Sequence, residues 1–225
     1  MYDIERIAIE IASAIICFIL VKFMIKPFQL TGETRHLFLG LGFGLLGTSY
    51  AFSAMSFALE ALHSWSPFFI SWFWVELLLR AFAFLFLAIT YYFSRLEKKT
   101  KLLWNTTFVI LVTLLAILIL SAIIFPQLPW SSYILINIYV RFFSLICLLY
   151  ISIQSLRSHL EQADPKTLLV PLGYILLGIS TYSSLIGAVD LTLFPLFGAL
   201  VLRLLGLGVL LFVCYKTFYH SEERE

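Results

Sequence analysis

Charged residues are scarce in this chain of 225 residues. Lys, Arg, Asp and Glu make up 12% of the sequence, whereas 61% of the residues are hydrophobic. A soluble domain carries roughly twice that share of charge, which is what covers its surface in water. The composition therefore excludes a soluble globular protein and indicates an integral membrane protein.

Residues that ligate metals or perform catalysis are also few. Cys17, Cys147 and Cys214 lie in three different apolar runs, and no Cys or His pair has the spacing of a metal site. No phosphate-binding loop, zinc-protease motif or nucleophile elbow is present. We therefore expect neither enzymatic activity, nor a metal site, nor a cofactor, and we do not expect nucleic acid among the partners.

Long apolar blocks dominate what remains. Each is about twenty residues long, which is the length of helix needed to cross a bilayer, and the alternating segments of a membrane barrel are absent. The predicted fold class is all-α, a polytopic cell-membrane protein with seven transmembrane helices in a single domain over residues 1–225. The spans are expected at about 4–26, 37–58, 68–93, 104–125, 131–153, 167–189 and 193–217.

The basic residues are distributed unevenly between the two ends of these spans. Of fifteen Lys and Arg residues, eleven fall at one face, three lie inside spans and only Arg6 falls at the other face. Short loops rich in Lys and Arg stay in the cytoplasm. We therefore predict an N-terminus outside and a cytoplasmic C-terminus. The eleven are Lys22, Lys26, Arg35, Arg95, Lys98, Lys99, Lys101, Arg157, Lys166, Lys216 and Arg224.

Three arginines, Arg80, Arg141 and Arg203, each lie near the middle of an apolar span. A charge at this depth is costly and is normally paired or functional. Glu76 precedes Arg80 by four residues, the spacing of an ion pair on one helix face, and Glu10 lies in the outer half of the first span. Two hypotheses stay open. The five residues form an ion-pair network that fixes the helices, or they line a cavity for an anionic or lipid-like ligand.

Glycines mark a second pattern, in which small residues share a helix face. Gly40, Gly44 and Gly47 follow one another at helical spacing in the second span, and the sixth span contains Gly173 and Gly178. Small residues at such positions let the backbones of two membrane helices approach closely. We predict helix packing at these five positions.

A basic turn, Thr31-Gly32-Glu33-Thr34-Arg35, leads into a helix punctuated by Gly and Ser from Leu39 to Tyr50. In this turn-and-helix motif and in its seven-helix layout, the chain resembles the membrane sensor modules that precede histidine kinases and cyclases in prokaryotes. The resemblance implies detection of an apolar or membrane-borne signal, with membrane lipids as neighbours. Because no kinase or cyclase follows in this sequence, the signal would pass to a protein partner at the cytoplasmic face or within the bilayer.

Two other functional classes fit the same sequence. The 22 phenylalanines and the short loops are typical of a non-catalytic structural subunit of a larger membrane complex. Seven helices with an outside N-terminus also match sugar-transporting PQ-loop proteins, which would make the chain a small-solute transporter. Those transporters use helices kinked by proline, whereas the first three spans predicted here contain no interior proline.

Overall fold

The computed structural model describes residues 2–32, 34–61, 68–93, 101–124, 130–162, 168–190 and 193–219. The described residues form seven α-helices, which confirms the all-helical prediction, and each helix is long and apolar enough to cross a membrane. The helices are α1 (Tyr2–Thr31), α2 (Thr34–Ala61), α3 (Phe68–Phe93), α4 (Lys101–Ile124), α5 (Trp130–Gln162), α6 (Leu169–Asp190) and α7 (Leu193–Tyr219).

The end of α1 differs from the prediction. The first span was expected to stop at Lys26, but α1 continues through Pro27 to Thr31, so the first helix does contain an interior proline. Proline removes one backbone hydrogen bond from a helix, and here that loss falls in the last turns. Gly32 ends the helix with a φ of 66°, and its N–H donates to the carbonyl oxygen of Phe28 at 2.8 Å.

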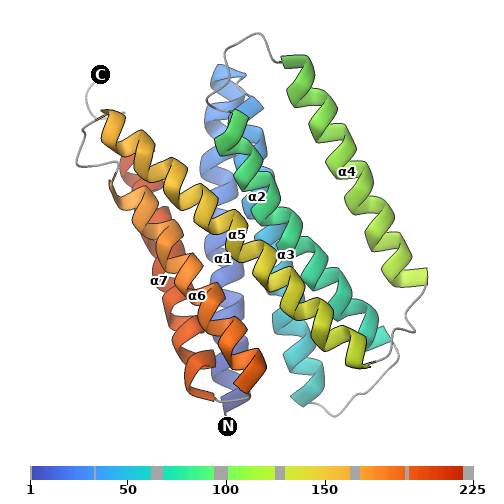
Figure 1. The fold of residues 1–225 in the computed structure, drawn as a ribbon. Helices are drawn as coiled ribbons and strands as arrows, with labels where there is room; N and C mark the ends of the chain where they lie inside the picture. Colours follow the sequence, from blue (N-terminus) through green and yellow to red (C-terminus); the bar gives the residue numbers. More distant parts are fainter. Residues whose placement is uncertain are drawn as a thin grey trace.

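Six of the helices form a closed ring through their contacts, and Figure 1 shows α4 set apart from them at one side. In the described part of the chain, α1 packs against α2 and α7, α3 packs against α2 and α5, and α6 packs against α5 and α7. The fourth helix lies outside this ring, against α3. Consequently α3 and α5 are neighbours in the ring although α4 separates them in the sequence.

The peripheral position of α4 follows from its composition. The helix is apolar on every side and contains no glycine, and Val109, Ile110 and Ile117 each expose more than half of their surface. Such a helix is suited to contact with lipid. An aromatic contact joins α4 to the ring of helices: the side chain of Trp104 lies edge-on to that of Phe38 on α2, with their ring centroids 4.6 Å apart.

The glycine face of α2 lies along α1. A Cβ atom placed on Gly44 would lie 3.7 Å from Cγ2 of Val21, and one on Gly47 would lie 3.0 Å from the Cβ of Cys17. Gly40 likewise faces Met24, at 3.7 Å. Of these three positions, Gly47 is the one closest to α1, and a larger side chain there would fit only with a shift of its neighbours.

Close approach recurs between α6 and α7, but not at both predicted positions. A Cβ on Gly206 would lie 2.9 Å from the carbonyl oxygen of Gly173, so these two glycines face one another. Nothing lies within 4 Å of a Cβ placed on Gly178, so the predicted close packing there is wrong. The physical reason is periodicity: five residues along a helix lead to a different face from Gly173.

Buried side chains fill the middle of the ring and form one continuous core cluster. Each of the six ring helices contributes to this cluster, and one set of six members, one from each helix, is at most 2% exposed. We call this set the leucine layer, because five of its six members are leucines. The members are Cys17, Leu46, Leu87, Leu148, Leu177 and Leu207.

Candidate functional site

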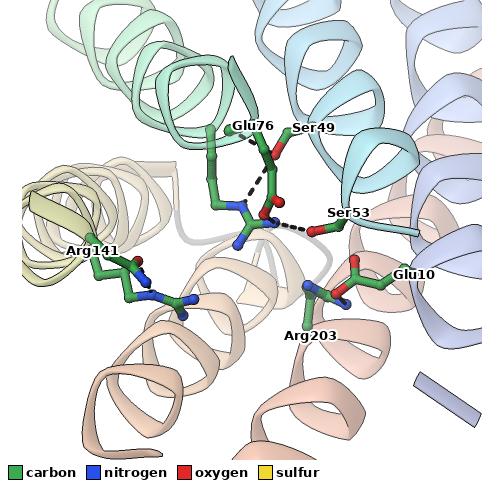
Figure 2. Close-up of polar contacts among 8 residues, drawn as sticks. Glu10, Ser49, Ser53, Glu76, Arg141 and Arg203 are labelled. Carbon is green, nitrogen blue, oxygen red and sulfur yellow. Dashed lines mark hydrogen bonds and ion pairs between the residues drawn. The ribbon is translucent and has the colours of Figure 1, made fainter. Parts of the chain in front are cut away.

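The three mid-span arginines occupy equivalent positions in the ring. Arg80, Arg141 and Arg203 lie ten to twelve residues after the first residues of α3, α5 and α7. At 1.5 Å per residue, each is about 15–18 Å along its helix. Figure 2 shows the labelled side chains of Glu76, Arg141 and Arg203, from three different helices, extending into the same region.

Arg80 is held by α3 and α2 together. Its Nη2 donates to Oε1 of Glu76 at 2.8 Å and to Oγ of Ser53 at 3.2 Å, and its Nε donates to Oγ of Ser49 at 3.2 Å. The hydroxyl of Ser49 in turn donates to the backbone carbonyl of Glu76 at 3.2 Å. The ion pair with Glu76 is the one that the four-residue spacing predicted.

Arg203 is paired across the ring instead of along its own helix. Its Nη2 lies 2.8 Å from Oε1 of Glu10 on α1, and both side chains are more than nine-tenths buried. Oε2 of Glu10 and Nε of Arg203 are buried without a hydrogen-bond partner among the described residues. The pair therefore joins α1 to α7, and one carboxylate oxygen and one guanidinium nitrogen of the pair can still form a hydrogen bond.

Tyr50 on α2 lies between the two ion pairs. The guanidinium carbon of Arg203 is 4.3 Å from the centroid of the Tyr50 ring, and that of Arg80 is 5.2 Å from it. The face of an aromatic ring attracts a cation, most strongly where water is excluded, and Tyr50 is only 2% exposed. One ring thus stabilises two neighbouring positive charges.

Arg141 has a neutral acceptor on its own helix. Its Nε donates to Oδ1 of Asn137 at 2.7 Å, and the side chain also takes part in other interactions. Asn137 stands four residues before Arg141, just as Glu76 stands four residues before Arg80. The corresponding residue on α7 is Ala199, which has no side-chain acceptor, so Arg203 needs a partner from another helix. The backbone carbonyl oxygen of Ala199 accepts a hydrogen bond from the Ser180 hydroxyl at 2.6 Å.

These side chains surround a cavity of about 230 Å³, which we call the arginine cavity. It lies in the half of the ring that holds the start of α1, and all five residues predicted as ligand-binding line it: Arg80, Arg141, Arg203, Glu76 and Glu10. The remaining lining residues are Arg6, Ser53, Phe57, Ser184, Gly187 and Leu200.

Arg6 is the most important lining residue that the sequence analysis did not include among the candidate ligand-binding residues. It lies on α1 and lines the cavity, with its guanidinium carbon 3.5 Å from the centroid of the Phe57 ring. Its position four residues before Glu10 was the available signal, because residues four apart share a helix face. With Arg6, the lining contains four guanidinium groups and two carboxylates.

A second cavity, of about 310 Å³, lies on the other side of the leucine layer, and we call it the apolar cavity. On α7, Leu200 and Arg203 line the arginine cavity and precede Leu207 of the layer, whereas Leu210 and Val213 line the apolar cavity and follow it. The apolar cavity is lined by Met24, Arg35, His36, Leu39, Phe43, Tyr91, Val170, Tyr174, Leu210, Val213, Cys214 and Thr217.

The lining of the arginine cavity, which is rich in guanidinium groups, is chemically suited to bind an anion. Among the described residues, no group of three or more His, Cys, Asp or Glu side chains is placed to ligate a metal ion. Guanidinium groups bind carboxylates and phosphates through paired N–H donors, strongly where water is excluded. Comparisons of the chain with protein-family models, with curated proteins and with solved structures found no match.

Proposed function

We propose that this protein is a receptor-like membrane module that binds a small organic anion in the arginine cavity and signals through a separate protein partner. The observation that carries the proposal is the charge of the lining, with four guanidinium groups against two carboxylates. Buried positive charge of this kind is costly, and a bound anion offsets the cost. The unsatisfied Nε of Arg203 is a donor that such an anion can accept from.

The dimensions and polarity of the cavity favour a small anion over a whole lipid. Its volume of about 230 Å³ is below the roughly 300–1,000 Å³ that is typical of pockets for drug-sized ligands. Guanidinium, carboxylate and hydroxyl groups from all six ring helices face it, and Leu200 and Phe57 are the only large apolar residues among those that line it. A compact molecule with one or two carboxylate or phosphate groups matches this chemistry.

The helix α5 provides a route from the cavity to a partner. It has 33 residues and is therefore about 50 Å long, whereas the hydrocarbon core of a bilayer is about 30 Å thick. Arg141 lies in the cavity wall, and the far end of the same helix exposes the Arg157–Glu161 ion pair and Leu160. A shift of α5 on anion binding would therefore move a surface where a cytoplasmic protein can bind.

The orientation that we propose has the N-terminus outside the cell membrane and the C-terminus in the cytoplasm. The support is the concentration of basic residues at the end opposite to the arginine cavity. We expect Ile4→Cys, at a 75% exposed position, to react with a membrane-impermeant maleimide on intact expressing cells. Lys216→Cys, at an exposed position near the other end, should react only after permeabilisation, and the reverse pattern would contradict the orientation.

Binding is tested directly with Arg141→Gln, because the hydrogen bond from Arg141 to Asn137 lies within one helix and its loss leaves the interhelical ion pair of Glu10 with Arg203 in place. The probes are succinate and inorganic phosphate, titrated onto protein in phosphatidylcholine nanodiscs. We expect the variant to bind the preferred probe at least about tenfold more weakly, the effect of one charge-assisted contact. The matched control is Arg157→Gln, an exposed arginine of the same helix that should change nothing.

Two results would contradict this function. The first is that neither probe binds to the unmodified protein. The second is that Arg141→Gln and Arg157→Gln weaken binding equally. The second would show that the anion is attracted by the overall charge of the protein and not by the cavity.

Transport is a second candidate, and it is favoured by the presence of two cavities in the same ring, one on each side of the leucine layer. An alternating-access transporter needs a binding site near the middle of the membrane that opens in turn to each side. The same protein reconstituted into liposomes distinguishes the two functions. Uptake of succinate or phosphate that Arg141→Gln abolishes identifies transport, whereas binding without uptake supports the receptor.

A further inference from the structure

We infer that the apolar cavity is a second ligand site, which takes a single-chain lipid with an acidic headgroup, such as a fatty acid. The site is independent of the arginine cavity, because the leucine layer separates them and they share no lining residue. The inference therefore stands even where the proposed function fails.

The walls of this cavity define the apolar part of the ligand. Met24, Leu39, Phe43, Val170 and Leu210 come from four different helices and surround the space. Apolar cavities of this size bind apolar molecules in preference to water. At about 310 Å³, enclosed by α1, α2, α3, α6 and α7, the space is narrow enough to favour one acyl chain over the two chains of a phospholipid.

Arg35 defines the acidic headgroup. It lines the cavity, its side chain is exposed, and it lies in the first turn of α2. The N-terminus of a helix carries a partial positive charge, and the first turn of α2 contains no acidic residue to balance it. A carboxylate or phosphate at this point would neutralise both the helix terminus and the guanidinium group.

The depth of the cavity agrees with a chain that enters beside Arg35. Phe43 lies eight residues further along α2, which is about 12 Å at 1.5 Å per residue. The deep wall includes Tyr174, which is 2% exposed and lies edge-on to Tyr91 with their ring centroids 5.6 Å apart. An acyl chain would thus extend from the basic end of the ring towards the leucine layer.

The test uses full-length protein in phosphatidylcholine nanodiscs, with laurate as the probe and native mass spectrometry to count bound molecules. We expect one laurate per protein and at least about tenfold weaker retention of methyl laurate, which has the same chain without the charge. Arg35→Gln should cause a similar loss for laurate. Lys216→Gln, which removes another exposed cation near the same end outside the cavity lining, should cause none.

A second pair of variants locates the chain. Val213→Trp fills the cavity and should abolish laurate binding, whereas Phe212→Trp alters a side chain of α7 that is 54% exposed on the outside of the ring and should not. Equal binding by these two variants would place the laurate on the outer surface and overturn the inference. Equal binding of laurate and its methyl ester would overturn it as well. Should Val213→Trp fail to fold, the exposed Arg35→Gln variant still decides the question.

Discussion

Replacing Gly206 by valine is expected to separate α6 from α7 and to destabilise the protein by about 3 kcal/mol or more, above the usual range for overpacking. A Cβ at this position would lie 2.9 Å from the carbonyl oxygen of Gly173 and 3.1 Å from Cγ of Leu177. The first of these atoms belongs to the backbone, so no rotamer change relieves the clash. Denaturation of the purified protein in mild detergent measures the loss.

Gly208 provides the matched control for that experiment. It lies on the same helix two residues further on, and nothing is within 4 Å of a Cβ placed there. Gly208→Val should therefore leave the stability close to that of the unmodified protein. Equal destabilisation by both valines would show that the helical glycines matter for backbone flexibility and not for the approach of α6 to α7.

Replacing Glu10 by alanine is expected to be of similar severity, about 3–5 kcal/mol, because it leaves the guanidinium group of Arg203 buried without its carboxylate. Both partners are more than nine-tenths buried, so solvent cannot take over the role of the carboxylate. The same denaturation measurement applies. Glu5→Ala, at an exposed position on the same helix, should have a negligible effect.

A double replacement distinguishes the stability lost when one partner of the ion pair is removed from the stability that the intact pair contributes. In Glu10→Leu with Arg203→Met, both charges are absent, and the stability should recover most of what Glu10→Ala loses, because apolar residues of similar size can replace a buried ion pair. The double variant should also lose anion binding if Arg203 contributes to the arginine cavity. A single Glu10→Ala variant as stable as the unmodified protein would mean that the pair is not formed.

The helices were predictable because membrane thickness imposes a length on each apolar block. The seven expected spans overlap the seven helices. The largest discrepancy is at α5, which continues nine residues beyond the expected end at 153, and α1 likewise continues five residues beyond 26, through Pro27. The ion pair of Arg80 with Glu76 was also predictable, since residues four apart on a helix are neighbours.

The partner of Arg203 could not be assigned from the sequence. Glu10 is separated from it by almost the whole chain, and no local periodicity links the first span to the last. The prediction could name both residues as candidates for one site, but pairing them required knowledge that α1 lies beside α7. The two cavities are equally non-local, because each is formed by side chains from at least five helices.

Closure of the ring by Glu10 and Arg203 has a consequence for biogenesis. Arg80 and Arg141 each find an acceptor four residues earlier on the same helix, so they can enter the bilayer already partnered. Arg203 obtains its carboxylate from α1, which is synthesised well before α7, so the pair forms only when α7 inserts. Insertion of α7 thus neutralises a carboxylate already in the bilayer, and a chain truncated before α7 leaves Glu10 without its guanidinium partner, which membrane quality control can recognise.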